Sequence, residues 1–189
     1  MDNRLLDKQW RTSHLYKIRN KKQQLVIFKR NKAQRDFNQN KWTRNLILKS
    51  RQLGFTTDES IDSLDDVLFN RNSECLLIAH NLDAGKAIFD KKINLAWNNI
   101  PIELRKLYKV DANTAQTLKF EFGDGSFSSI AVDTSGRSGT YNRVHITEFA
   151  DICKKYPNKV KDIIEGTIPA VPTNGRVDIE STSQGASGE

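Results

Sequence analysis

The stretch from Asn45 to Thr57 constrains the fold of this chain more than any other part of the sequence. It opens with three consecutive apolar residues, Leu46 to Leu48, between polar neighbours. Such a short apolar run is typical of a buried strand in a parallel sheet. A loop with one glycine, Gly54, and two threonines follows, and the next residues can begin a helix. We therefore expect a strand, a tight loop and a helix in succession.

The same order is found in P-loop nucleotide sites, whose pattern is G-x-x-x-x-G-K-[ST]. Here Lys49 stands at the first glycine position and Phe55 at the lysine position, while Gly54 and Thr56 agree with the pattern. A phosphate cradle needs inward N–H groups, a helix N-terminus, a cation, and a hydroxyl for the metal. Lys49 can supply the cation, and Thr56 or Thr57 the hydroxyl. The pattern alone leaves open a plain strand, turn and helix junction.

The size and composition of the chain are those of one globular domain. At 189 residues it is long enough for one core and too short for two large domains. No run approaches the length of a membrane span and no signal peptide is evident, which predicts a cytosolic protein without a membrane partner. Cys75 and Cys153 lie far apart without metal-ligand spacing, and we expect reduced thiols.

The positive charge is concentrated at the amino end. Residues 1–51 hold 15 of the 30 Lys and Arg residues and three acids, whereas the remaining residues hold 15 basic and 20 acidic residues. This asymmetry predicts a polyanion near the N-terminal part, whether DNA, a nucleotide or an acidic protein surface. The alternative is a solvated basic face. Residues 1–27 are interpreted as a basic arm that packs on the domain or docks on a neighbour.

Strands and helices alternate along the rest of the chain, which favours a parallel α/β sheet. Apolar runs predict further strands near 75–79, 143–147 and 177–181, and alternation around a glycine-rich turn predicts a hairpin at 117–132. Helical spacing predicts helices over 31–40, 57–70, 81–98 and 155–167. The helix at 57–70 reads as amphipathic, and its first-turn acids Asp58 and Glu59 suit the positive end of the helix dipole.

Glu148 follows an apolar strand, as the second half of an ATPase site requires. The carboxyl ends of parallel strands meet at one edge of a sheet, where an acid can orient an attacking water and bind Mg²⁺. Glu148 is therefore the candidate base and, with Thr56, a candidate Mg²⁺ ligand. The usual preceding aspartate is Thr147 here, so metal contact is weaker or comes from a hydroxyl or from Asp151. The alternative for Glu148 is an exposed strand end.

Taken in order, these segments resemble the large subunits of bacteriophage terminases, the motors that package DNA into capsids. K-S-R-Q-L-G-F-T-T at 49–57 looks like the deviant phosphate loop of that family, and H-I-T-E-F-A at 145–150 is similar to its H-x-S-E-x-A segment. The resemblance implies an α/β P-loop NTPase of the ASCE, RecA-like type, with a mainly parallel central sheet flanked by helices and a β-hairpin insertion near 117–132. It implies an ATPase domain over 28–189, truncated at its C-terminal end and without the nuclease domain.

The resemblance also assigns an adenine site upstream of the loop. In the family a glutamine motif selects adenine, and F-x-x-N-x-x-Q matches it at Phe28, Asn31 and Gln34. A carboxamide can read the edges of adenine and an aromatic ring can stack on it. The residues alone leave open that Asn31 caps a helix and that Gln34 is exposed.

Two further motifs are matched by position. In the family an arginine in the loop before the catalytic strand acts on the nucleotide of a neighbouring subunit, and Arg137 matches that place; the alternative is a surface loop residue. The segment E-S-T-S-Q-G is similar to the coupling motif, which senses the γ-phosphate and contributes Ser181, Thr182 and Gln184. The alternative there is an ordinary polar exit from a strand.

The resemblance thus implies a Mg²⁺-dependent ATPase that drives double-stranded DNA into a procapsid. It implies a ring of identical copies, a small terminase subunit and a capsid portal as partners, and a place in the host cytoplasm at the procapsid. The residues expected to bind ATP are Lys49, Ser50, Arg51, Gln52, Leu53, Gly54, Phe55, Thr56, Thr57, Phe28, Asn31 and Gln34. Two alternatives remain: a helicase-like ATPase, or a basic module that binds DNA or a partner without hydrolysis, which the substitutions at Phe55 and Thr147 favour.

Overall fold

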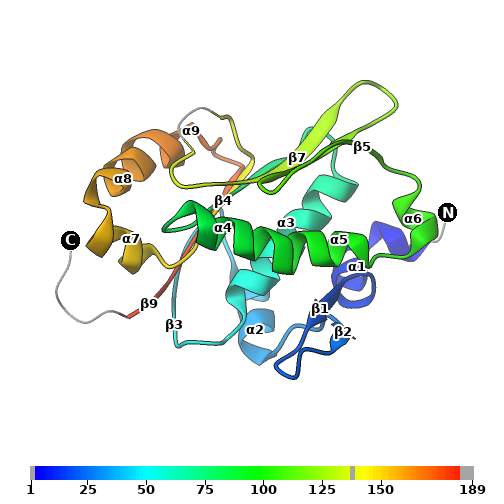
Figure 1. The fold of residues 1–189 in the computed structure, drawn as a ribbon, viewed down its shortest axis with the longest axis horizontal. Coiled ribbons are helices and arrows are strands. Elements are labelled where there is room, and N and C mark those ends of the chain that lie inside the picture. Colours follow the sequence, from blue (N-terminus) through cyan, green and yellow to red (C-terminus); the bar gives the residue numbers. More distant parts are fainter. Residues whose placement is uncertain (1–2, 137–138, 184–189) are drawn as a thin grey trace.

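The computed structural model describes residues 3–136 and 139–183, and this part of the chain forms a seven-stranded sheet (Figure 1). The spatial order of the strands is β3-β9-β8-β4-β7-β6-β5. The first five run parallel, and β6 and β5 are antiparallel to their neighbours. The strands are β3 (Arg44–Lys49), β4 (Glu74–Ile78), β5 (Lys109–Asn113), β6 (Thr117–Glu121), β7 (Phe127–Asp133), β8 (Arg143–Ile146) and β9 (Arg176–Thr182).

Helices cover both faces of the sheet (Figure 1). One face carries α3 (Phe55–Phe69), α4 (Leu82–Ile88), η2 (Phe89–Asn94) and α5 (Leu95–Asn98). The other carries α7 (Phe149–Lys155), α8 (Pro157–Asp162), η3 (Ile163–Thr167) and α9 (Ile168–Ala170). Leu77 of β4 packs in the first core, whereas its neighbours Leu76 and Ile78 pack in the second. One strand serves both cores because successive side chains point to opposite faces.

The predicted α/β fold with a mainly parallel sheet is confirmed. The predicted hairpin is formed by β6 and β7. Because β7 also pairs in parallel with β4, the hairpin is part of the central sheet. The sequence did not predict β5, whose residues are mostly polar and exposed.

The strand order brings three sequence segments to one edge of the sheet. β9 lies between β3, which precedes the phosphate loop, and β8, which precedes Glu148. Lys49 pairs with Thr182, so β3 and β9 end together. Ile146, the last residue of β8, pairs with Ile179, and the residues that follow it, Thr147 and Glu148, continue toward the same edge. The carboxyl ends of parallel strands form the usual ligand edge of an α/β sheet. The loop, Glu148 and the coupling segment therefore meet at this edge.

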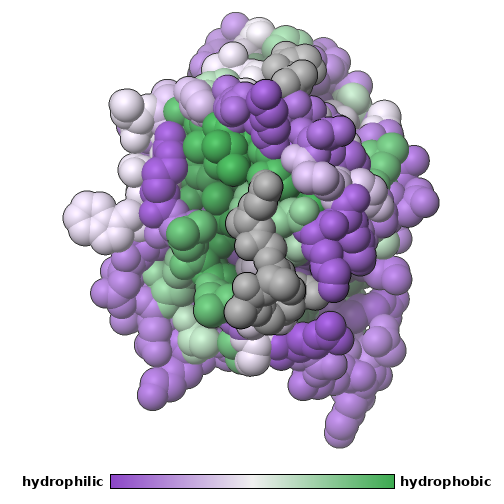
Figure 2. Space-filling model, turned by 90° about the vertical axis from the view of Figure 1, so that its left-hand side faces the viewer, coloured by the Kyte–Doolittle hydropathy of each residue, from purple (hydrophilic) through white to green (hydrophobic). Residues whose placement is uncertain are grey.

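β3 is less buried than its apolar sequence predicts. Ile47 is 8% exposed, but Leu46 and Leu48 are 83% and 79% exposed. Within residues 3–136 and 139–183, β3 is the outermost strand of the sheet. Figure 2 shows apolar surface on this side of the molecule. The prediction of a parallel strand is confirmed, whereas the prediction of a buried one is wrong for the face that bears the two leucines.

The first part of the chain packs on α3. Its elements are η1 (Asn3–Leu6), α1 (Lys8–His14), β1 (Lys17–Arg19), β2 (Leu25–Ile27) and α2 (Lys32–Asn40). The buried Arg11 donates hydrogen bonds to both Asp65 oxygens at 2.7 to 3.2 Å, and the Tyr16 hydroxyl donates to Asp65 at 2.7 Å. Of the two alternatives for the N-terminal segment, the structure shows packing on the domain.

The acidic face of α3 is buried, which differs from the amphipathic helix that its sequence suggests. Asp58 and Glu59 are both 0% exposed. They are covered because basic side chains from α1, β8, β9 and the segments on either side of α2 pair with this face; Arg143, for example, lies 2.5 Å from Glu59. We call this set the α3 ion network: Asp58, Glu59, Asp62, Asp65 and Asp66 with Lys8, Arg11, Arg30, Lys41, Arg143 and Arg176.

The remaining predicted elements are present. The helix expected at 81–98 is the continuous run α4, η2 and α5, which the Asn81 side chain caps by accepting from the Ala84 N–H at 2.8 Å. A short helix, α6 (Ile102–Arg105), follows. Cys75 is buried and Cys153 is half-buried, and neither forms a disulfide with a described residue. No helix in the described part of the chain is both long and apolar enough to cross a membrane.

Candidate active site

The loop between β3 and α3 is a tight turn with two residues in the left-handed region. Gln52 and Gly54 both have positive φ angles, 65° and 75°. Gly54 stands directly before α3, and its carbonyl accepts from the Thr57 and Asp58 N–H groups at 3.0 Å. The first N–H groups of a helix lack partners within it and attract anions. Glycine suits position 54, because the φ of 75° is left-handed and a Cβ there would lie 2.9 Å from the Gln34 amide nitrogen.

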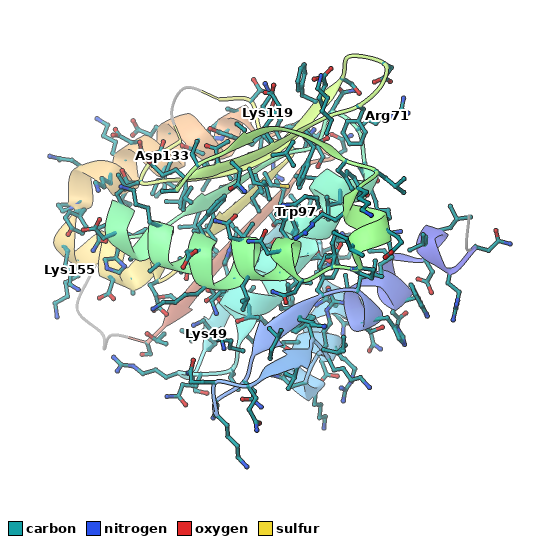
Figure 3. The ribbon with its side chains drawn as sticks, turned by 45° about the vertical axis from the view of Figure 1, so that its right-hand side comes forward. Lys49, Arg71, Trp97, Lys119, Asp133 and Lys155 are labelled. Carbon is teal, nitrogen blue, oxygen red and sulfur yellow. The ribbon has the colours of Figure 1, made fainter. Side chains whose placement is uncertain are left out.

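Lys49 directs its ammonium into the site. Its Nζ lies 3.3 Å from Glu148 Oε1 and 3.9 Å from Glu180 Oε2, and its side chain is 6% exposed. Figure 3 shows Lys49 at the end of the sheet where α3 begins. A cation on the last residue of β3, rather than on the first turn of α3, thus reaches Glu148 and Glu180.

Glu148 holds a strained backbone conformation at the start of α7. Its φ of 53° and ψ of 48° are left-handed, a region that a glutamate seldom adopts. Strained residues of this kind concentrate at functional sites. Its side chain is 33% exposed, and its Oε2 accepts from the Thr182 hydroxyl at 3.3 Å. Glu148, the candidate base, and Thr182, a candidate coupling residue, are therefore in direct contact.

Glu180 is the first residue of the E-S-T-S-Q-G segment, and the sequence alone assigned it no role in the site. It is 0% exposed on β9, and its Oε1 accepts hydrogen bonds from the hydroxyls of Thr56 and Thr147. Burial alone raises the pKa of this carboxyl, but His145, Thr56 and Lys49 outweigh burial and hold the pKa below its usual value. The signal in the sequence is an acid inside the strand V-D-I-E, where a buried strand would carry an apolar residue.

Lys92 is a second cation near the loop. It comes from η2 on the same face of the sheet, and its Nζ donates to Thr57 Oγ1 at 2.6 Å. Burial lowers the pKa of Lys92. Nothing in the sequence around Lys92 singled it out, because the contact depends on how η2 crosses the start of α3.

Of the three residues expected at adenine, Asn31 and Gln34 support the loop in this structure. Gln34 is 3% exposed, and its amide nitrogen donates to the carbonyls of Leu53 and Gly54 at 3.3 and 2.8 Å. Asn31 caps α2, and its side chain also donates to the Leu53 carbonyl at 2.9 Å. Phe28 is buried in the larger core. The helix cap is confirmed, Gln34 is not exposed, and adenine contact stays a prediction.

The other predicted residues are distributed as follows. Ser50 and Arg51 are exposed on the loop, and Ser181 Oγ accepts from the Ala150 N–H of α7 at 3.0 Å. Arg137 and Gln184 lie outside the described residues.

The oxygen atoms around Thr56 are suitable ligands for a hydrated magnesium ion. Among residues 3–136 and 139–183, no group of three or more His, Cys, Asp or Glu side chains is arranged as a metal site. Mg²⁺ in phosphoryl-transfer sites uses one or two carboxylates, with waters and substrate phosphates. Thr56, Glu148 and Glu180 supply such a set, and Glu180 Oε2 receives no hydrogen bond from any described residue. The residues therefore fit Mg²⁺.

Comparisons of whole folds identify close likenesses, although no protein-family model and no curated protein matches the sequence. The ATPase domain of the large terminase of Thermus phage P74-26, in a mutant form, has a TM-score of 0.67 at 18% identity, covering 85% of this chain and 68% of that chain. The large terminase of bacteriophage HK97 has a TM-score of 0.67 at 13% identity, covering 95% of this chain and 37% of that chain. The chain has the fold of a large-terminase ATPase domain. In this terminase fold the phosphate loop, Glu148 and Glu180 lie together at the carboxyl edge of the sheet.

Proposed function

We propose that this chain is the ATPase motor domain of a phage terminase large subunit, which hydrolyses ATP to drive double-stranded DNA into a procapsid. The observation that carries the proposal is the position of Lys49 Nζ, 3.3 Å from Glu148 and 3.9 Å from Glu180 at the end of a P-loop-like turn. A phosphate loop needs a cation at this place, and the usual lysine position holds Phe55. The likeness of the fold to terminase ATPase domains supports the same assignment.

Each residue of the cluster has a distinct proposed role. Lys49 and the loop N–H groups bind the phosphates of ATP, and Thr56 holds Mg²⁺. Bound Mg²⁺ neutralises charge that develops on the phosphates. Glu148 accepts a hydrogen bond from the attacking water and orients it, a role that suits a partly exposed carboxylate. Thr182, which donates to Glu148 at 3.3 Å, links the state of the site to β9.

The proposed assembly is a ring of copies on DNA. Arg137 is supplied in trans to the nucleotide of the next copy, the coupling segment with Ser181, Thr182 and Gln184 transmits the γ-phosphate state, and double-stranded DNA is the polyanion. A small terminase subunit and a capsid portal are the further partners. The motor works in the host cytoplasm at the procapsid.

Binding of a non-hydrolysable ATP analogue with Mg²⁺, measured by calorimetry, tests the proposal. We expect Lys49→Ala to weaken binding at least tenfold, because the cation that meets the phosphates is gone. Lys106→Ala, which removes an exposed lysine on another surface, should stay within twofold of the wild type. Absence of binding by the folded wild type would refute the proposal.

Phosphate release tests hydrolysis and the shared arginine together. Lys49→Ala and Arg137→Ala chains should each be inactive alone, and a mixture should regain activity because only neighbours can complement. Analogue binding without phosphate release in any mixture would favour the non-hydrolysing basic module, which the Thr147 substitution suggests. DNA-stimulated strand separation would instead favour a helicase-like ATPase.

A further inference from the structure

The position before Glu148 lacks the acid that P-loop sites usually place there. In those sites an aspartate and the loop hydroxyl together hold Mg²⁺, but this chain has Thr147. We propose that Glu180, on the neighbouring strand β9, supplies the missing carboxylate and positions Thr56 and the hydrated Mg²⁺. This inference rests on the proposed ATPase function.

The hydrogen bonds of Glu180 place it behind the loop hydroxyl. Thr56 Oγ1 donates to Glu180 Oε1. A hydroxyl has one proton and two lone pairs. Because its proton is committed to Glu180, the lone pairs of Thr56 face away from that carboxylate and are available to a cation. Outer partners of this kind orient a metal ligand and raise its affinity for the metal.

Thr147 and Glu180 occupy adjacent places on adjacent strands. Ile146 of β8 is the register partner of Ile179 of β9, so Thr147 and Glu180 are one step further along the same pair. The strands lie about 4.8 Å apart. Thr147 Oγ1 donates to Glu180 Oε1 at 2.7 Å. An aspartate at position 147 would repel the Glu180 carboxylate at this distance. Thr147 instead donates a hydrogen bond to Glu180 and supports it.

Glu180 also keeps unused capacity for a hydrated ion. It is 0% exposed, and its second oxygen, Oε2, receives no hydrogen bond from the described part of the chain. Lys49 Nζ lies 3.9 Å from this oxygen, beyond hydrogen-bond distance. Buried carboxylate oxygens are seldom left without a donor. A water of the metal is a donor of the right kind for this place.

The test compares the affinity for a non-hydrolysable ATP analogue in Mg²⁺ with that in EDTA. We expect Glu180→Gln, which keeps the size of the side chain, to lower the ratio of the two affinities about tenfold while binding in EDTA changes little. The exposed Glu103→Gln should keep the wild-type ratio. A purely structural role for Glu180 would weaken binding equally in both conditions and leave the ratio unchanged.

The outcomes separate this inference from the proposed function. A folded wild type that binds no analogue refutes the ATPase function and, with it, this inference. A wild type that binds equally in Mg²⁺ and EDTA, or a Glu180→Gln ratio that falls less than threefold, overturns the inference alone. If Glu180→Gln does not fold, the double variant Thr147→Asp/Glu180→Gln decides: it returns the carboxylate to β8 and should keep the Mg²⁺ enhancement, and a folded double variant without enhancement overturns the inference.

Discussion

Two groups of buried charges lie on the same face of the sheet, and they are built differently. In the α3 ion network, Arg143 meets three carboxylates, Glu59, Asp62 and Asp66, at 2.5 to 2.8 Å with its side chain 4% exposed. At the phosphate loop, Lys49 stands between two carboxylates at the longer distances of 3.3 and 3.9 Å. The contacts of the network are shorter, whereas those of the loop cluster are longer and the cluster reaches solvent through Glu148.

The two groups of charges lie at opposite ends of the same strands, β8 and β9. Arg143 begins β8 and pairs tightly within the network, and Glu148 stands just past its end. Asp178 and Glu180 repeat this order on β9, where Asp178 lies 2.5 Å from Arg176 and Glu180 belongs to the loop cluster. Tight pairing supports the fold at one end of these strands. Incomplete pairing at the carboxyl ends leaves capacity for a ligand.

The largest effect should come from removing the central guanidinium of the network. Arg143→Ala leaves the buried Glu59 and Asp62 and the partly buried Asp66 without their common cation. Breaking a buried pair in this way costs about 3–5 kcal/mol of unfolding free energy. Urea denaturation measures the loss. Arg71→Ala, which removes a pair with Asp124 on the surface, should cost less than about 1 kcal/mol. Equal losses for the two variants would contradict the structural role of the network.

The loop cluster should respond to charge removal in activity instead of stability. Glu148→Gln keeps the shape of the side chain, so it should unfold within about 0.5 kcal/mol of the wild type and retain nucleotide binding. The rate of phosphate release by an assembly of Glu148→Gln chains should fall by about 10² to 10⁴ relative to an assembly of wild-type chains, which is the usual contribution of a positioned base. The exposed Glu165→Gln is the control. Hydrolysis at the wild-type rate would remove Glu148 from the proposed mechanism.

The sequence predicts the parts of this comparison that depend on local pattern. The strand, loop and helix around Gly54 and the acid after β8 follow from apolar runs and glycine placement. Glu180 does not, because its partners Thr56 and Thr147 lie 124 and 33 residues away. The acids of α3 also look solvent-facing in the sequence, since their cations come from segments 21 to 117 residues away. Burial of a charge is decided by such distant partners, and a single sequence does not show them.

A smaller effect is expected where the loop is held by backbone geometry. Gly54→Ala places a Cβ at a φ of 75° and 2.9 Å from the Gln34 amide, so we expect a loss of about 1–2 kcal/mol. Gly123→Ala is the matched control, because nothing lies within 4 Å of a Cβ there and its φ is not in the left-handed range. Nucleotide affinity should fall in the first variant only. A neutral Gly54→Ala would show that the loop adjusts without its Gln34 support.

The smallest effect concerns the basic residues that the network does not use. Lys8 lies 2.6 Å from Asp66 and belongs to the network, whereas Lys21 and Lys22 are exposed between β1 and β2. If DNA meets the exposed set, Lys21→Gln/Lys22→Gln should reduce the slope of log affinity against log salt by up to about 2, at nearly unchanged stability. Lys8→Gln should instead lower stability and leave the salt slope unchanged. Each phosphate contact that is lost lowers the number of counterions released when DNA binds, and so lowers the slope. A slope that Lys21→Gln/Lys22→Gln does not alter would therefore place DNA on another surface.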